Sequence, residues 1–180
     1  MSILCQRAER AVCKALIHLG SDDLEGIDLF DAFVGNEDTA IANVLEQAVE
    51  GEYSFTLSFY TGETTATIST PAIIVTSNNA TEDQDAAGNA LVDVQVDVMF
   101  PAESDPDENV IKQLEAASVW VWQVLHRSDL AELVSNEHDS LTVCGVDPAG
   151  FDGGRITEGR QRIHRYRVRL YCAGKTLVVE

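Results

Sequence analysis

Four histidines and four cysteines are the side chains in this sequence best suited to bind a metal ion or to act as nucleophiles. The histidines are His18, His126, His138 and His164, and the cysteines are Cys5, Cys13, Cys144 and Cys172. No histidine stands at zinc-ligand spacing from a cysteine or from another histidine, and no C-x-x-C pair occurs. No cysteine lies in a pattern that marks an activated nucleophile, and a Gly-x-Ser-x-Gly elbow is missing. We therefore predict no metal site and reduced cysteines, with the histidines on the surface or at helix ends.

Two other segments could be taken for ligand sites. Asp105, Asp107 and Glu108 could hold a cation, but the twelve-residue calcium-loop pattern is missing and the start of a helix explains them fully. The glycine-rich stretch from Gly145 to Gly154 lacks the Gly-Lys-Ser/Thr ending of a phosphate-binding loop. With no catalytic, metal-binding or cofactor-binding constellation, we predict that the chain is not an enzyme and uses no cofactor.

The charges are numerous and segregated along the chain. Thirty acidic and twelve basic residues give a formal net charge of -18, which disfavours binding nucleic acid by neutralising phosphates. Twenty acidic residues and no Lys or Arg lie between Ala15 and Ile111, whereas Arg155 to Arg169 contains six arginines. Two explanations remain open: basic strands neutralise acidic neighbours within one subunit, or subunits dock acidic face to basic face.

The elements of the first half include an N-terminal amphipathic helix over residues 2–19, with Gly20 as its stop. Val44, Leu45, Ala48 and Val49 suggest a second, shorter helix. Alternation from Tyr53 to Tyr60, a turn at residues 61–63 and a further strand at 64–70 predict a hairpin, which we interpret as an insertion spanning residues 51–70.

The second half alternates between strands and helices. We predict strands at 72–76, 92–98, 141–146 and 161–172, helices at 104–125 and 129–134, an exposed mobile loop at 77–89 and a glycine-rich loop at 147–159. Ser128 is a candidate cap for the shorter helix. This order predicts one α+β domain over residues 1–180. Its single, mainly antiparallel β-sheet is packed by a long central helix and the N-terminal helix, with an extra β-hairpin.

Strand alternation also predicts which charged residues share a face. Val92, Val94, Val96 and Val98 face a core, which places Asp93 and Asp97 on the opposite, acidic face. In the last strand, Arg165, Arg167 and Arg169 lie opposite the core-facing Tyr166, Val168, Leu170 and Cys172. We predict that Asp93, Asp97, Arg165, Arg167 and Arg169 contribute to a subunit interface. Trp120 and Trp122 lie about 200° apart on their helix, so one of them is a candidate partner contact.

From Pro71 onward, the order of these features resembles the tail-terminator and neck proteins of long-tailed phages. The similarity rests on the run from Thr70 to Val75, the polar loop, the Val92–Val98 strand and an acid-started helix. It continues through Asp129–Val134, Leu141–Val146, the glycine loop and the strand ending at Cys172. The segment 51–70 departs from the short form of this family, and the role of residues 20–70 stays open.

The resemblance implies a structural virion protein, assembled in the host cytoplasm, with no active site. Its subunits would form a six-membered ring that caps the tail tube, ends tube polymerisation and joins the tail to a head-side connector or stopper protein. DNA would pass the acidic lumen without specific binding, and no membrane partner is expected because no apolar run is long enough to cross a bilayer. The alternatives are another neck or head-completion protein, or a cellular α+β binding domain with an undetected ligand site.

Overall fold

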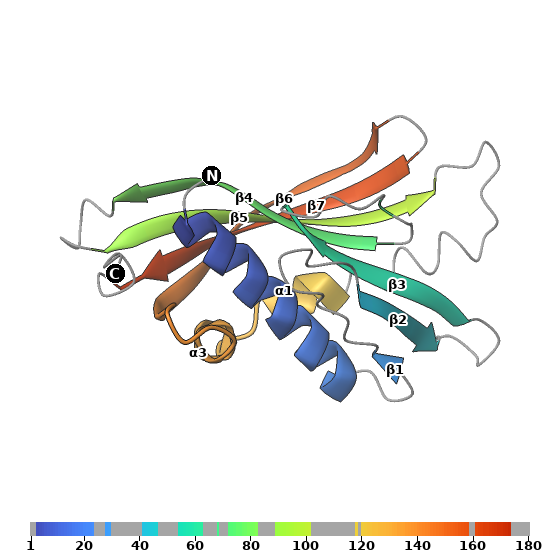
Figure 1. Ribbon diagram of the computed structural model, residues 1–180. Helices are drawn as coiled ribbons and strands as arrows, with labels where there is room; N and C mark the ends of the chain where they lie inside the picture. The colour runs from blue at the N-terminus through green and yellow to red at the C-terminus, as the bar shows by residue number, and fades with distance from the viewer. Residues whose placement is uncertain are drawn as a thin grey trace.

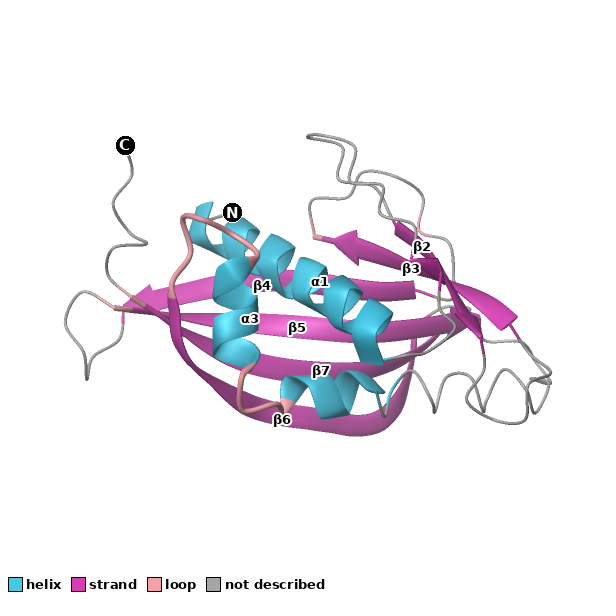
Figure 2. Cartoon of the chain, turned by 90° about the horizontal axis from the view of Figure 1, so that it is seen from below, coloured by secondary structure: helices cyan, strands magenta, loops and turns pink. Residues whose placement is uncertain are grey.

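A computed structural model of the chain describes residues 3–23, 28–29, 41–46, 54–62, 68, 72–82, 89–101, 118, 120–158 and 161–173. Its helices are α1 (Ile3–Asp23) and α3 (Leu130–Asn136), together with a helical segment that includes residues 120–125. The strands are β1 (Asp28–Leu29), β2 (Ile41–Glu46), β3 (Ser54–Thr61), β4 (Ala72–Glu82), β5 (Ala90–Pro101), β6 (Val143–Glu158) and β7 (Gln161–Cys172). All of these helices lie on one face of the sheet (Figures 1 and 2).

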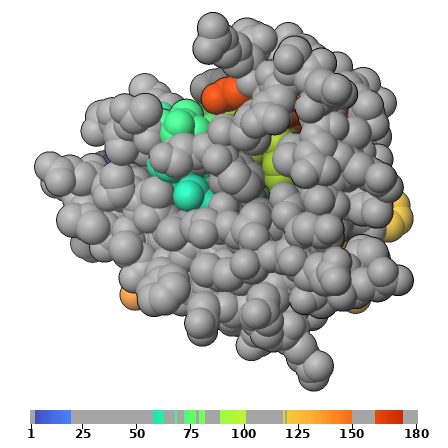
Figure 3. Space-filling view, turned by 90° about the vertical axis from the view of Figure 1, so that its right-hand side faces the viewer, coloured from blue at the N-terminus to red at the C-terminus, as the bar shows by residue number. Residues whose placement is uncertain are grey.

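The strands form one seven-stranded sheet in the order β1-β2-β3-β4-β5-β7-β6. Every neighbouring pair is antiparallel except β3 and β4, which run parallel. At the end of the sheet where β5 finishes, atoms of β3, β5 and β7 reach the surface near one another (Figure 3). A mainly antiparallel sheet with helices on one face confirms the predicted α+β fold.

The hydrophobic core lies between α1 and the central strands. Good helix formers without a proline favour α1, and its apolar stripe is buried. The stripe consists of Leu4, Cys5, Ala8, Ala11, Val12, Ala15, Leu16 and Leu19. Small alanines and cysteines let the helix approach β4 and β5, whose valines are also buried. Each fully buried Val or Leu contributes about 1.5–3 kcal/mol, so this stripe orients the helix on the sheet.

Two predictions for the first half of the chain are wrong. The helix α1 continues through Gly20 to Asp23, because a glycine costs only about 1 kcal/mol relative to alanine when no proline follows. The helix predicted around Val44–Val49 is a strand where the structure describes it, since β2 pairs with β3 from Ile41 to Glu46. A short apolar run does not distinguish the two, and the pairing partner decides.

The predicted hairpin is only partly described. β3 confirms the strand predicted from Tyr53 to Tyr60, and its antiparallel partner is β2. The second hairpin strand, residues 64–70, lies outside the described residues apart from Ile68, which is exposed and has no strand assignment. On its other side β3 pairs with β4.

Two segments predicted to be loops are strands over much of their length. β4 extends to Glu82 through a register shift between Thr76 and Asn79, so the predicted loop 77–89 is wrong for residues 77–82, while 83–88 lie outside the described residues. β6 extends to Glu158, so the predicted glycine loop 147–159 is wrong as far as residue 158. The reason is the same in both: β-bulges absorb glycine and polar residues without ending the strand.

The helices near the C-terminal half agree with prediction where they are described. Residues 104–117 of the predicted long helix lie outside the described residues, but 118 and 120–125 are helical. Trp120 is 7% exposed and Trp122 is 47% exposed, as their angular separation predicts. α3 matches the predicted short helix, although Asp129 rather than Ser128 occupies its N-cap position, without a side-chain cap bond. β7 spans the predicted residues 161–172.

Candidate interaction surface on the sheet

The face of β5 and β7 that points away from the helices carries alternating acidic and basic side chains. Antiparallel pairing sets Asp97 opposite Arg165, Gln95 opposite Arg167 and Asp93 opposite Arg169. Because side chains alternate along a strand, all of these residues share one face while the intervening valines enter the core. The structure thus brings together the five residues predicted for an interface. We call this the charged sheet face.

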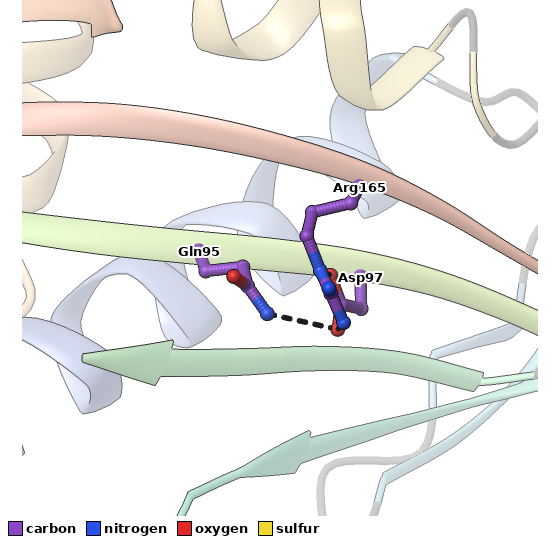
Figure 4. Close-up of polar contacts among 3 residues, drawn as sticks. All are labelled: Gln95, Asp97 and Arg165. Atoms are coloured by element: carbon purple, nitrogen blue, oxygen red, sulfur yellow. Dashed lines mark hydrogen bonds and ion pairs between the residues drawn. The ribbon is translucent and has the colours of Figure 1, made fainter. Parts of the chain in front are cut away.

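Asp97 and Arg165 form a two-pronged ion pair. Arg165 Nε donates to Asp97 Oδ1 and a terminal guanidinium nitrogen donates to Oδ2, each at 2.9 Å. Gln95 Nε2 donates to the same Oδ2 at 3.0 Å, so three donors converge on one carboxylate (Figure 4). The side chains of Asp97 and Arg165 are 11% and 19% exposed. Such paired, charge-assisted hydrogen bonds are geometrically demanding and fix both side chains.

The second pair is more exposed. Arg169 Nε donates to Asp93 Oδ1 at 2.8 Å, and the two side chains are 39% and 42% exposed. The hydrogen bond and charge of Asp93 raise the pKa of Arg169 above its ordinary value, with a small contribution from Asp147. Asp147 lies opposite Arg169 on β6, so this row of the sheet holds an arginine between two carboxylates. Exposed pairs of this kind contribute about 0–1 kcal/mol.

Arg167 stands between the two ion pairs and differs from them in its exposure. Its register partners are Gln95 on β5 and Gly150 on β6. Arg167 is exposed, whereas Arg165 and Arg169 are partly buried. Arg167 is therefore the arginine of this face whose charge is most accessible to a partner.

Exposure changes along the face. Met99 and Ile163, which follow Asp97 and Arg165 in register, are 7% and 1% exposed. Arg167 is exposed in the row of Gln95, and Asp147 is exposed in the row of Asp93. The surface available to a partner is therefore concentrated on the rows with Arg167, Asp93 and Arg169.

The outer strand of this side of the sheet is poorly suited to strand addition. β6 is the last strand in the sheet order and contains Pro148. Its pairing with β7 shifts register at three places, between Val143 and Gly145, Pro148 and Gly150, and Asp152 and Ile156. Bulges and proline interrupt the row of backbone groups that a new strand would need. A partner approaching here would use side chains of the face in preference to the edge.

A serine and a histidine meet under the helical layer, which the sequence did not indicate. Ser118 Oγ lies 2.8 Å from His164 Nδ1, and the Tyr166 hydroxyl donates to the Ser118 carbonyl at 2.7 Å. A Ser–His hydrogen bond is the first unit of many nucleophilic sites, but Ser118 is only 4% exposed. Burial raises the pKa of Tyr166 against the lowering effect of its bond to Ser118. These two hydrogen bonds hold the helical residue Ser118 against β7.

A second missed residue is Glu9, which is fully buried on α1. Its two carboxylate oxygens accept hydrogen bonds from the backbone N–H of Gly62 at 3.0 Å and of Ser77 at 2.6 Å. Ser77 lies in the bulge of β4, so Glu9 joins the helix to an irregular part of the sheet. The sequence held a signal for this, because Glu9 shares its side of the helix with the buried Cys5 and Cys13.

The remaining chemistry-bearing side chains are dispersed. His126 Nδ1 donates to the Trp122 carbonyl at 2.8 Å, and His18 Nδ1 lies 2.6 Å from Glu137 Oε1. Cys5, Cys13 and Cys172 are buried and Cys144 is exposed. Within the part of the chain that the structure describes, no group of three His, Cys, Asp or Glu side chains could hold a metal ion. Nor does any helix there combine the length and hydropathy that crossing a bilayer requires.

Comparison with models of known protein families gives no match to this chain. Comparison with curated protein sequences also gives no significant match.

Proposed function

We propose that this chain is a non-enzymatic virion subunit that assembles into a ring, caps a phage tail tube and joins it to a head-side connector or stopper protein. The observation that carries the proposal is the charged sheet face, which presents Arg167 and an exposed acid–base pair on the side of the sheet opposite the helices. The strands β4, β5, β6 and β7 and the helix α3 support it, because they are elements on which the resemblance to tail terminators rests, although the two loops of that resemblance are strands over much of their length.

Ring assembly requires each subunit to carry two different surfaces that fit one another. The charged sheet face supplies one of them. The pair Asp97–Arg165 gives this face a fixed geometry, and Arg167 is exposed on the same face. One exposed charge pair contributes little, but the same contact is repeated at every subunit boundary of a ring.

The acidic composition supports the same assignment. A net charge of -18 keeps the chain from adhering to DNA, which suits the wall of a channel through which DNA must slide. In this proposal the protein ends tube polymerisation by surface complementarity alone, because a bound ring occupies the surface that the next tube subunit would use.

The proposal is tested with substitutions at Arg167 measured in low salt, where screening is weakest. Arg167→Glu reverses the charge, and Arg167→Lys is the matched control that keeps it. We expect Arg167→Glu to abolish ring formation in light scattering and electron microscopy with cognate tail tubes, and Arg167→Lys to retain it. Both variants should melt within a few degrees of the parent, since Arg167 is exposed. Assembly of Arg167→Glu at the parent's level would overturn the role of this face.

A further inference from the structure

One edge of β4 extends beyond the strand that pairs with it. β3 pairs with β4 only between Ala72 and Val75, whereas β4 continues along β5 to Glu82. Among the residues that the structure describes, no strand lies on the β3 side of β4 beyond Val75 (Figure 2). Backbone N–H and C=O groups at such an edge can pair with a further strand. We call residues 79–82 the open edge of β4.

The carboxylate of Glu9 marks where this edge begins. The last backbone link between β3 and β4 is the bond from the Gly62 N–H to the Val75 carbonyl at 3.0 Å. Glu9 accepts the N–H of Ser77 at 2.6 Å, and so takes the place that a strand carbonyl would occupy there. β4 then shifts register before Asn79 and pairs regularly with β5 to its end. The open edge is therefore a regular run of strand.

Side-chain direction identifies the backbone groups that point out of the open edge. The carbonyl of Val75 points toward β3, and its side chain is buried in the core. Along one strand, residues whose side chains share a face also point their backbone groups to the same edge. Ala80 packs against the core after the register shift, so its N–H and C=O point out of the open edge. Thr81 alternates with it and directs its backbone groups toward β5.

The chemistry of the open edge indicates what kind of segment would pair with it. Residues 79–81 carry no charge, and Ala80 lies partly buried against the hydrophobic core. An apolar side chain beside Ala80 would extend that core, and β-branched residues favour the strand conformation. The occupant that fits is therefore an extended, uncharged segment of apolar and β-branched residues.

The chain itself carries such a segment after β7. Residues 176–179 are a threonine, a leucine and two valines, of which three are β-branched and none is charged. β7 ends at Cys172, which is in register with Ala90 of β5, and Glu82 at the end of β4 is in register with the same residue. The segment thus leaves the sheet at the end where the open edge lies.

Within one subunit this segment is poorly placed to reach the open edge. The Ala173 N–H donates to the Thr142 carbonyl at 2.9 Å, so the chain leaves β7 on the side of β6, away from β4. The outer side of β4 lies three strand spacings from β7, or about 14 Å, which takes about four extended residues to cross. A crossing over residues 174–177 would leave only Val178 and Val179 to pair. A second copy can offer all four residues of the segment.

We propose that residues 176–179 of one copy of this chain add as a strand to the open edge of β4 in a second copy. The donor segment and the acceptor edge are different surfaces, so the contact is heterologous and can close into a ring. This inference rests on the assembly of copies in the proposed function, and it supplies a contact beside that of Arg167. Because it consists of backbone hydrogen bonds and apolar side chains, this contact should resist salt.

Proline substitutions test the two halves of the contact separately. Ala80→Pro removes the outward N–H of the acceptor edge without removing a hydrogen bond to β5, and Val178→Pro disrupts the donor strand. We expect each variant to weaken self-association about tenfold or more in sedimentation velocity, in low and in high salt. Ala80→Val and Val178→Ile are the matched controls, which keep the N–H groups and should assemble like the parent.

Mixing the two proline variants in high salt, where contacts between charges are screened, tests the pairing directly. The Ala80→Pro chain keeps its donor segment and the Val178→Pro chain keeps its acceptor edge, so one contact can form between them. We expect a discrete dimer in the mixture and monomers of each variant alone. Exchange of the Ala80 amide in the Val178→Pro chain should slow about tenfold or more in the mixture. If Ala80→Pro does not fold, the parent replaces it as the donor.

The outcomes separate this inference from the proposed function. If the parent forms rings and both proline variants form them equally well, strand addition is wrong and the ring stands. Strand addition between copies is also wrong if the mixture stays monomeric, or if the Ala80 amide exchanges equally slowly in the monomeric parent. If the parent joins into open chains that never close, strand addition stands and the ring fails. A parent that stays monomeric with and without tail tubes contradicts both.

Discussion

Removal of the Asp97 carboxylate should reveal how much of the charged sheet face serves the stability of the subunit itself. Asp97→Ala deletes the acceptor of two bonds from Arg165 and one from Gln95. Hydrogen bonds to charged groups contribute about 1.5–3 kcal/mol, and stranding one member of a buried pair costs about 3–5 kcal/mol. Because the two side chains keep 11% and 19% exposure, water reaches the stranded guanidinium and we expect a loss of about 2–3 kcal/mol.

The outer pair on the same face is the matched comparison. Asp93→Ala removes a single bond between side chains that are about 40% exposed, so we expect it to cost less than about 1 kcal/mol. Double-mutant cycles in urea, with Arg165→Ala and Arg169→Ala as the second changes, isolate the two coupling free energies. Raising the salt to about 1 M should shrink the Asp93–Arg169 coupling and leave most of the Asp97–Arg165 coupling. Equal couplings with equal salt sensitivity would refute the distinction between a structural pair and an exposed one.

Three further predictions follow from buried and shifted groups. Glu9→Gln should lower the free energy of unfolding by about 1–3 kcal/mol in urea titration. The NH2 group of the glutamine would face a backbone N–H donor, of Gly62 or of Ser77, and could not accept its hydrogen bond. An unchanged free energy of unfolding would mean that the Glu9 carboxylate does not hold the bulge. Burial raises the pKa of the Cys172 thiol to about 12, so the thiol ionises at lower pH in the unfolded chain than in the folded one. The contribution of this thiol to stability is therefore intact below pH 9 and is lost between pH 9 and 12. Cys172→Val should reduce this loss, as measured by thermal melts at each pH. Lys14→Gln should raise the pKa of His138 in an NMR titration, and an unchanged pKa would show that the cation acts too weakly at that turn.

The faces of the strands and the bounds of the last strand could be predicted from local sequence pattern. The alternation of valines in β5 and of arginines in β7 fixes which side chains share a face, and the structure confirms both. The sequence alone does not indicate which residues of that face lie opposite one another. Antiparallel register, which only the folded chain sets, assigns Asp97 to Arg165 and Asp93 to Arg169 and places Arg167 opposite Gln95.

The elements that local sequence pattern predicts wrongly depend on pairing with another strand of the sheet. Residues 77–82 are polar and residues 147–158 contain several glycines, yet both continue a strand because a neighbouring strand supplies hydrogen bonds across the bulges. The contact of Ser118 with His164 joins residues 46 positions apart, and that of Glu9 with Ser77 joins residues 68 apart. Spacing along the chain does not indicate which residues form such pairs, although the helical spacing from Cys5 and Cys13 places Glu9 on a buried side of α1.

We propose that this chain closes into a ring on the end of a tail tube. Electron microscopy of cognate tail-tube protein, polymerised with and without the chain, tests it most directly. We predict a closed ring of density at one end of each tube and shorter tubes as the chain is added before elongation. Tubes of unchanged length with no ring at either end would contradict the account.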